Sequence, residues 1–326
     1  MSGTRENRSA ESVEIGKIGV LSEIRGTREV MEELGAVPNY VLAPLTSIKI
    51  GGPADWFLSA ESADDVAVMN LIAKGRGLPV TIMGNGSNLL VSDRGVRGVV
   101  IRMEGGLAAV TEVGGGLLNV GAGVRLPELA KFFRDQNAGG LEWGFGVPGC
   151  VGGAIYMNAG TSRGEMKDIV ESVFVIGRGG IVKEIPAPEC HFAYRTSRFQ
   201  RTGEIIVGAM IRMADRPYDA SGAEESLRYR KTTQPLDQPN CGSVFRNPPG
   251  TTAGQLIESV GLKGYRIGNA QISPKHANFI VNLGGARAVE VRDLMNLARE
   301  RVRESHGIEL ISEVRLFGDW GDDGRE

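Results

Sequence analysis

The sequence is poor in the residues on which several classes of protein depend. Its 326 residues include only three cysteines, too few for a disulfide framework, so we expect a reducing, cytoplasmic location. The histidines His191, His276 and His306 are scattered and lack the spacing of a metal site, which predicts that no metal takes part in the chemistry. Lysine and arginine total 37 against 39 aspartates and glutamates, so no overall field favours nucleic acid or an anionic membrane.

Long apolar segments are missing as well. No stretch approaches the ~20 apolar residues of a membrane span, and residues 1–16 have neither the basic nor the apolar region of a signal peptide. Residues 1–20 are polar and predict a mobile tail. At roughly 150 residues per domain, the rest of the chain is long enough for about two domains with a cleft between lobes.

Glycine, in contrast, is abundant. It accounts for 47 of the 326 residues, well above the usual ~7 per cent. Many backbone positions must therefore adopt unusual torsions or approach another group closely. This favours loops shaped around a ligand.

The first part of the chain has the order of an α/β unit. Ser62 and Asp65 form a capping box at the start of a helix that should end near residues 75–77. Apolar runs at 78–83 and 98–103 predict two strands with a glycine loop between them. We assign residues 21–105 to this first subdomain.

The pattern then changes to short strands joined by turns. Residues 110–113 and 117–120 flank three glycines as a hairpin, and Leu126 opens a helix. Further strands are expected at 173–176, 181–185 and 204–213. We assign residues 106–215 to a second, α+β subdomain.

A polar stretch from Arg216 to Glu225 predicts a domain boundary. Residues 216–326 should form a third lobe, also α+β. Its expected elements are a helix near 224–233, a helix capped by Thr252, a strand at 277–282, a long amphipathic helix and a final strand at 308–317.

Two glycine loops suggest nucleotide binding. The loop at 84–88 exposes backbone N–H groups, as a pyrophosphate needs, although a plain turn explains it equally well. The loop at 146–153 leads into residues 154–160, where glycines let a helix start approach a flat ring or phosphate. A tight crossing between lobes is the alternative. Together the loops favour one extended dinucleotide, and residues 46–52 are expected to line the same cleft.

Three polar residues are candidates for chemistry. Ser243 follows a glycine but lacks a Gly-x-Ser-x-Gly elbow, so it suits proton donation to a strongly basic partner better than acyl transfer. Glu313 should share one face of the last strand with Arg315. Arg195 can pair bidentately with a substrate carboxylate. The alternatives are a turn serine, a surface charge pair and a solvated arginine.

Six ordered segments together resemble one family, the UDP-N-acetylenolpyruvoylglucosamine reductases, from about residue 42 to residue 318. The segments are GNGSNLLVSDRGVRGVVIRM (84–103), GFGVPGCVGGAIYMNAG (144–160), AYRTSRF (193–199), QPLDQPNCGSVFRNP (234–248), LIESVGLKGYRIGNAQISPKHANFIVN (256–282) and SEVRLFG (312–318). The resemblance implies a mixed α+β and α/β fold. An FAD-binding module of two subdomains, of the vanillyl-alcohol-oxidase (PCMH) type, would be followed by an α+β substrate-binding domain.

The resemblance also implies the reaction. NADPH would reduce non-covalent FAD and leave, and the enolpyruvyl ether of UDP-N-acetylglucosamine would then take the same pocket and become UDP-N-acetylmuramate, a peptidoglycan precursor. By similarity, Ser243 is the proton donor, whereas Arg195 and Glu313 stabilise the enol-like intermediate. For that, Glu313 must be protonated or hydrogen-bonded, which needs a raised pKa.

Further site residues follow from the same resemblance. The expected cofactor-binding residues are Gly51, Gly84, Asn85, Gly86, Ser87, Asn88, Leu89, Val147, Pro148, Gly149, Gly152, Gly153, Asn158 and Ala159. The expected substrate-binding residues are Tyr194, Gln234, Asn247, Arg315 and Lys231, with Arg230 as the alternative to Lys231 at the diphosphate.

The sequence departs from the family pattern in places. No segment between residues 207 and 228 matches the tyrosine-bearing loop of the long form, so the chain resembles the short form. Residues 161–163 differ from the usual run after Asn158, and Cys150 replaces a small polar residue, although we expect FAD to stay non-covalent. The remaining alternatives are an oxygen-using oxidase of the wider flavoprotein class and a catalytically silent flavin- or UDP-sugar-binding protein. We expect a monomer with small-molecule partners, no nucleic acid and no membrane span.

Overall fold

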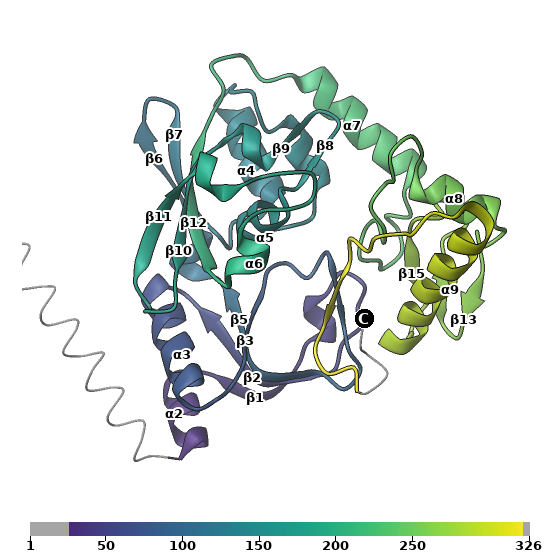
Figure 1. Ribbon diagram of the computed structural model, residues 1–326. Helices are drawn as coiled ribbons and strands as arrows, with labels where there is room; N and C mark the ends of the chain where they lie inside the picture. Colours follow the sequence, from purple (N-terminus) through teal and green to yellow (C-terminus); the bar gives the residue numbers. More distant parts are fainter. Residues whose placement is uncertain (1–25, 322–326) are drawn as a thin grey trace, which may run out of the picture.

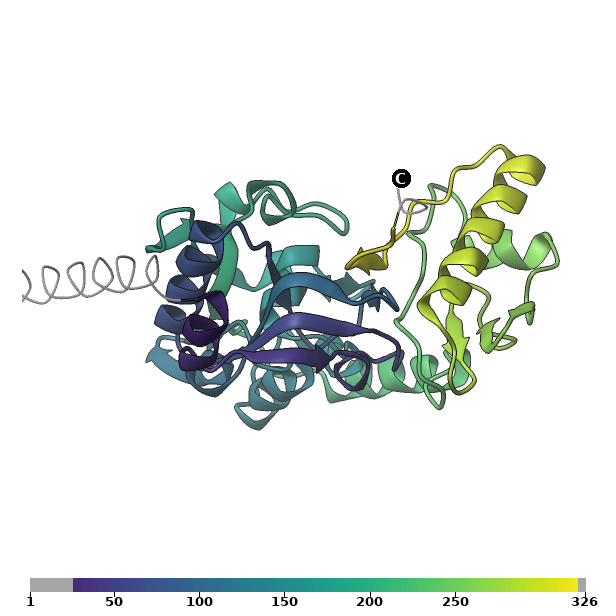
Figure 2. The same ribbon diagram turned by 90° about the horizontal axis from the view of Figure 1, so that it is seen from below.

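The computed structural model describes residues 26–321. The expected tail at 1–20 lies outside the described residues. Figure 1 shows two parts stacked on one side of the molecule and a third part, made of helices and a small sheet, on the other. Figure 2 shows an elongated body with the first helices at one end, the C-terminal helices at the other, and the first sheet between them.

The first sheet forms as the apolar runs predict. Its strands, in spatial order, are β1 (Val37–Val41), β2 (Pro53–Ala60), β5 (Val96–Met103) and β3 (Val80–Met83). Strands β2, β5 and β3 run parallel, and β1 is antiparallel to β2. Helices α2 (Thr27–Glu33) and α3 (Ala63–Gly75) belong to this part. The predicted capping box is present, because Ser62 accepts from the Asp65 N–H at 3.1 Å.

The second sheet is antiparallel throughout. In spatial order it contains β11 (Val182–Pro186), β10 (Val170–Ile176), β12 (Ile205–Arg212), β7 (Leu117–Gly121) and β6 (Val110–Gly114). Its companions are α4 (Leu126–Asp135), α5 (Val151–Met157), α6 (Phe199–Thr202) and a small hairpin of β8 (Gly160–Thr161) and β9 (Gly164–Glu165). Short 3₁₀ turns are η1 (Ala43–Leu45), η2 (Gly105–Ala108), η3 (Glu142–Gly146), η4 (Met166–Asp168) and η5 (Ala187–Cys190).

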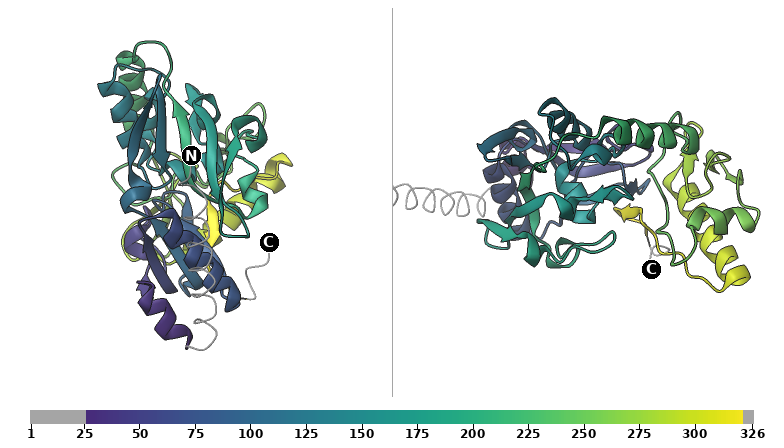
Figure 3. Two further views of the ribbon diagram at one scale, coloured as in Figure 1. Left: turned by 90° about the vertical axis from the view of Figure 1, so that its left-hand side faces the viewer. Right: turned by 90° about the horizontal axis from the view of Figure 1, so that it is seen from above.

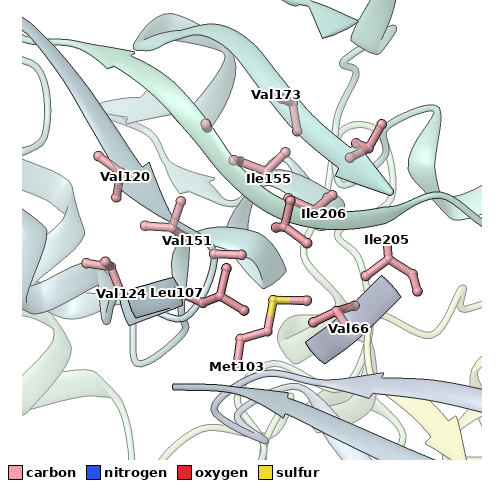
Figure 4. Packing of buried hydrophobic residues seen from close by; sticks show 14 of the residues in the cluster. Val66, Met103, Leu107, Val120, Val124, Val151, Ile155, Val173, Ile205 and Ile206 are labelled. Carbon is pink, nitrogen blue, oxygen red and sulfur yellow. The ribbon is translucent and has the colours of Figure 1, made fainter. Parts of the chain in front are cut away.

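One hydrophobic core joins these two parts. Val66 and Met103 from the first part lie in the same buried cluster as Val151 and Ile206 from the second (Figure 4). Burial of apolar area is the main stabilising contribution to such an interface. The two sheets therefore form one body with a seam between them.

A second core lies in the C-terminal part and also includes Ile48, Ile50 and Leu90 from the first part. Helix α7 (Ala220–Thr233) leads from the second sheet toward it, along the upper edge of the molecule in Figures 1 and 3. Helices α8 (Ala253–Ser259) and α9 (Ala288–His306) pack with a sheet of β13 (Arg266–Ile267), β14 (Ala270–Ile272) and β15 (Ile280–Asn282). The face of α9 predicted to be apolar is buried in this core.

The chain end returns to the first part. Strand β16 (Arg315–Phe317) pairs in parallel with β4 (Leu89–Val91), directly after the first glycine loop. In addition, the Asp93 carboxylate accepts the Ala288 N–H at 2.8 Å and so caps α9 from across the cleft. The C-terminal part is thus joined to the rest of the molecule by α7, by β16 and by the cap on α9.

Three expectations about this part are wrong in extent. The final strand covers residues 315–317 instead of 308–317, because the N–H groups of Glu313 and Val314 both turn toward the Val244 carbonyl. The strand expected at 277–282 covers only Ile280–Asn282, because the Phe279 N–H closes a turn on the His276 carbonyl. The helix expected near 224–233 begins earlier, at Ala220, because the Asp219 side chain caps it by accepting the Gly222 N–H.

Candidate active site

A single large cavity runs along the seam and opens between all three parts. It encloses about 1630 Å³. Its wall includes the first glycine loop, the second glycine loop with the start of α5, one side of α7, and the residues around Ser243 and Glu313. Segments far apart in the sequence therefore share one site.

The two glycine loops lie against each other. The side-chain amide of Asn85 donates to the Pro148 carbonyl. The Asn88 side chain donates to the Glu313 carbonyl at 2.9 Å, and the Arg315 N–H donates to the Asn88 carbonyl at 3.0 Å. The loops are thus fixed both to each other and to the C-terminal segment.

Two glycines in this wall leave room that the protein does not use. A Cβ at Gly149 would meet only Ser87 Oγ at 3.8 Å, and a Cβ at Gly153 only Cys150 Sγ at 3.6 Å. Neither glycine has the positive φ that would exclude other residues. Because neither packing nor backbone conformation requires glycine there, the space suits a flat group lying against the main chain. These residues therefore fit a flavin nucleotide.

Most of the predicted cofactor-binding residues line the cavity. They are Gly84, Asn85, Gly86, Ser87, Asn88, Leu89, Val147, Pro148, Gly149, Gly152, Gly153 and Ala159. Two do not. Gly51 has φ +151° and packs against Val91, whereas Asn158 is fully buried in the left-handed conformation that ends α5. The Asn158 amide holds the Ala193 carbonyl at 3.0 Å, so it shapes the wall from behind.

Some of the predicted substrate-binding residues line the cavity and others do not. Gln234 and Arg315 line the cavity, whereas Tyr194, Lys231 and Asn247 lie outside its wall. The Tyr194 ring is half exposed, Lys231 is exposed, and the side-chain amide oxygen of Asn247 accepts the Ala253 N–H at the start of α8. Substrate binding by these three residues stays a prediction.

The three predicted catalytic residues all reach the cavity. Arg195 Nε lies 2.8 Å from Glu313 Oε1, and Arg195 Nη2 donates to the Gly160 carbonyl at 2.8 Å. Burial raises the pKa of the Glu313 carboxyl, although the charges of Arg195 and Arg246 work against this. The raised pKa is the condition under which Glu313 can act as a proton-bearing neighbour. Ser243 directly follows Gly242, whose φ of +80° lies in the left-handed region that favours glycine.

Arg230 carries an unbalanced charge in the wall. Its Nε donates to Gln234 Oε1 at 2.9 Å, and it is absent from the ion pairs of the described residues. Burial lowers the pKa of its guanidinium. A partly buried cation without an anion costs free energy, so the site favours an anionic ligand here.

Sequence reasoning missed other residues of the wall. Tyr156 Oη accepts from Arg315 Nη2 at 3.2 Å, and the Gln200 amide reaches two carbonyls beside Arg195. Tyr156 stands inside the second glycine segment, where an aromatic residue on a short helix could have been noticed. For Gln200 the sequence carries no local signal, because its partners come from separate segments.

In the part of the chain that the structure describes, no helix is long and apolar enough to cross a bilayer. Residues 26–321 also contain no group of His, Cys, Asp and Glu able to hold a metal ion.

Comparison with known proteins identifies the family. Residues 54–185 match the family model of an FAD binding domain, and residues 234–317 match that of the UDP-N-acetylenolpyruvoylglucosamine reductase C-terminal domain. UDP-N-acetylenolpyruvoylglucosamine reductase 2 of Symbiobacterium thermophilum is 45% identical over 277 residues, covering 84% of this chain and 89% of that protein. The chain belongs to the UDP-N-acetylenolpyruvoylglucosamine reductase family.

Other UDP-N-acetylenolpyruvoylglucosamine reductases are also similar to this chain over most of its length. The enzyme of Heliobacterium modesticaldum is 46% identical over 85% of this chain and 88% of its own length. The crystal structure of the Thermus caldophilus enzyme matches with a TM-score of 0.71 and 38% identity, covering 85% of this chain and 97% of that one. The fold is therefore an FAD-binding module followed by the family's C-terminal domain, as predicted. Members of this family are FAD-dependent oxidoreductases of peptidoglycan synthesis, and FAD is the cofactor that the cavity fits.

Proposed function

We propose that this chain uses NADPH to reduce the enolpyruvyl ether of UDP-N-acetylglucosamine to UDP-N-acetylmuramate. Bound FAD would supply the redox chemistry, taking a hydride from NADPH and delivering it to the β-carbon of the enol ether. One cavity of about 1630 Å³ serves both partners in turn. The proposal depends chiefly on one observation, that Ser243, Arg195 and Glu313 share the wall of the cavity that the glycine loops line.

The protein's own residues then handle charge and proton. Hydride addition leaves carbanion character on the α-carbon beside the substrate carboxylate, and Arg195 can bind that carboxylate as a fork. Glu313, whose pKa is raised by burial, shares a proton or hydrogen bond with the developing enolate instead of repelling it. Ser243 donates the proton that completes the saturated product.

The diphosphate of the UDP-sugar is assigned to Arg230. Lys231 is exposed, whereas Arg230 lines the cavity beside Gln234 and Tyr229. A guanidinium without a carboxylate partner suits a phosphate group, which it can bind bidentately. Arg230 thus supplies binding at the nucleotide end, where the short form lacks a tyrosine loop.

The domain roles follow from this placement. Residues 21–105 and 106–215 would hold FAD along their seam, and residues 216–326 would cover the UDP-sugar. We propose a monomer located in the cytoplasm. The three cysteines are unpaired, which agrees with a reducing compartment. Size-exclusion chromatography with light scattering tests the oligomeric state.

Anaerobic stopped-flow absorbance tests the reaction. The flavin bands should bleach with NADPH and return on mixing with the enolpyruvyl UDP-sugar. Rapid reoxidation by oxygen without any response to the UDP-sugar would favour an oxidase. Binding of both ligands without turnover would favour a silent binding protein.

A further inference from the structure

The turn that carries Arg195 has a conformation that arginine rarely takes. Ala193 and Thr196 exchange both backbone hydrogen bonds at 3.1 Å, and Arg195, inside this tight turn, has φ +55°. Glycine or asparagine is favoured at such a left-handed position. A longer side chain persists there only where its surroundings hold the backbone.

The main-chain carbonyl of Arg195 is the point at which it is held. Gln200 Nε2 donates to this carbonyl at 3.2 Å from within the FAD-binding module. Arg246 Nη2 donates to the same oxygen at 3.2 Å, but Arg246 belongs to the C-terminal part. The backbone N–H of Arg246 is in turn fixed by the Ile311 carbonyl at 2.9 Å.

Two side-chain contacts span the cleft in opposite directions. Arg246 reaches from the C-terminal part to the carbonyl of Arg195, while the Arg195 side chain reaches back to Glu313 at 2.8 Å. We propose that Arg246 is a positioning residue that fixes the Arg195 turn from across the cleft. It aligns the guanidinium for the substrate carboxylate only when the two parts adopt this arrangement. This inference rests on the proposed role of Arg195 as the carboxylate clamp.

The charge of Arg246 offers a competing explanation. It lies close enough to favour the anionic form of Glu313, so Arg246 would then act on the site directly and independently of Arg195. A double-mutant cycle separates the two explanations, because a residue that acts through Arg195 has nothing left to act on once Arg195 is removed.

The experiment uses the full chain with bound FAD, reduced anaerobically with dithionite so that NADPH plays no part. Reoxidation by the enolpyruvyl UDP-sugar is followed by stopped flow in wild type, Arg246→Met, Arg195→Met and the double variant. Arg246→Met should slow reoxidation about ten- to hundredfold, as expected for the loss of a charged hydrogen bond. In the Arg195→Met background the same substitution should change the rate by no more than about twofold.

Ser92→Ala is the matched control. It removes the hydrogen bond from Ser92 Oγ to the Asp319 carbonyl, which also joins the two parts, and the one that Ser92 Oγ accepts from the Arg94 N–H at 3.1 Å; neither touches Arg195. Its reoxidation rate should stay near that of wild type. An equal slowing by Ser92→Ala would show that general loosening of the two parts explains the effect, and would overturn the positioning role.

The other possible results of the cycle also test the inference. A loss from Arg246→Met that persists undiminished in the Arg195→Met background would overturn the inference in favour of a direct charge effect, with the clamp role of Arg195 intact. Wild-type reoxidation in Arg195→Met alone would remove the clamp role itself, and the inference with it. If Arg246→Met does not fold with its flavin, the cycle is run with Arg246→Lys, whose smaller loss must likewise vanish when Arg195 is absent.

Discussion

Arg195 and Glu313 form an ion pair of 2.8 Å that joins the FAD-binding module to the C-terminal segment. Both side chains are mostly buried, at 17% and 19% exposure. Arg195 lines the cavity, and Nη2 of its guanidinium donates to the Gly160 carbonyl. The pair therefore leaves Arg195 partly free for a ligand while fixing its direction.

The first prediction concerns the geometry of this pair. Arg195→Lys keeps the charge but cannot reach Glu313, Gly160 and a carboxylate at once, since an ammonium lacks the planar fork. We expect reoxidation by the enolpyruvyl UDP-sugar to fall by about tenfold or more, with flavin reduction by NADPH nearly unchanged. Arg198→Lys is the control, because Arg198 lies on the same loop but pairs with Glu204. Near-wild-type turnover of Arg195→Lys would leave Arg195 with a structural role only.

The second prediction separates the two half-reactions. Ser243→Ala removes the proposed proton donor, so the step that consumes the enol ether should slow by about 10²- to 10⁴-fold. Flavin reduction by NADPH needs no protonated carbon and should proceed as in wild type, which makes it the internal control. Single-turnover absorbance at the flavin band measures both steps. Equal losses in both halves would contradict proton donation by Ser243.

The third prediction compares neighbouring cations on α7. Arg230 lines the cavity and Lys231 does not, so only Arg230→Met should weaken the binding of the UDP-sugar. We expect its KM to rise by about tenfold or more, in line with the loss of a charge-assisted hydrogen bond, while kcat changes little. Lys231→Met is the matched control at the next residue. A larger effect from Lys231 would reverse the assignment of the diphosphate.

Local signals predicted the framework of this fold. The Ser62 cap, the hairpin at the triple glycine and the apolar face of α9 follow from spacing alone, and each is found in the structure. These features depend on neighbours a few residues away, which is why one sequence sufficed.

The same reasoning could not predict which strands and side chains from distant parts of the sequence would pair. The parallel pairing of β16 with β4 joins the C-terminal part to the strand that follows the first glycine loop, and no periodicity in either segment indicates the partner. Asn247 illustrates the same limit at the site, because its amide oxygen accepts the Ala253 N–H at the start of α8, a contact that the motif does not indicate. Asn158, likewise, sits behind the cavity wall and supports the turn before Arg195. Motifs indicated which segments meet, but not which side chains face the cavity.

The fourth prediction tests whether FAD occupies the space beside Gly153. Gly153→Ala places a methyl group in the cavity without a protein clash. Flavin occupancy of the purified protein should therefore fall, as measured by the absorbance ratio of flavin to protein. The apoprotein should nevertheless gain up to ~1 kcal/mol of stability, because alanine is a better helix former than glycine.

Gly152→Ala is the control for this prediction. Its Cβ would sit 2.9 Å from the Cβ of Ala122, so this variant should lose stability in the apoprotein. A Gly153→Ala protein with full flavin occupancy would show that the cofactor does not approach the main chain at this point.

The last prediction concerns the junction where α7 begins. Burial would raise the pKa of the Glu142 carboxyl, but hydrogen bonds from Arg216 and from the Gly140 and Asp219 N–H groups lower it overall. The stability that the carboxylate contributes is complete above its ordinary pKa of 4.5. As the pH falls further, through the lowered pKa of the folded state, this contribution is lost.

Glu142→Gln should therefore cost about 1.5–3 kcal/mol of unfolding free energy at pH 7, the usual value for hydrogen bonds to a charged group. The difference from wild type should shrink as the pH is lowered below 4.5, because the wild-type carboxyl is then protonated too. Urea titrations followed by tryptophan fluorescence measure it. Glu171→Gln, which breaks an exposed pair with Arg212, should cost less than ~1 kcal/mol. A loss at Glu142 that does not change with pH would mean that the shape of the side chain, and not its charge, anchors the start of α7.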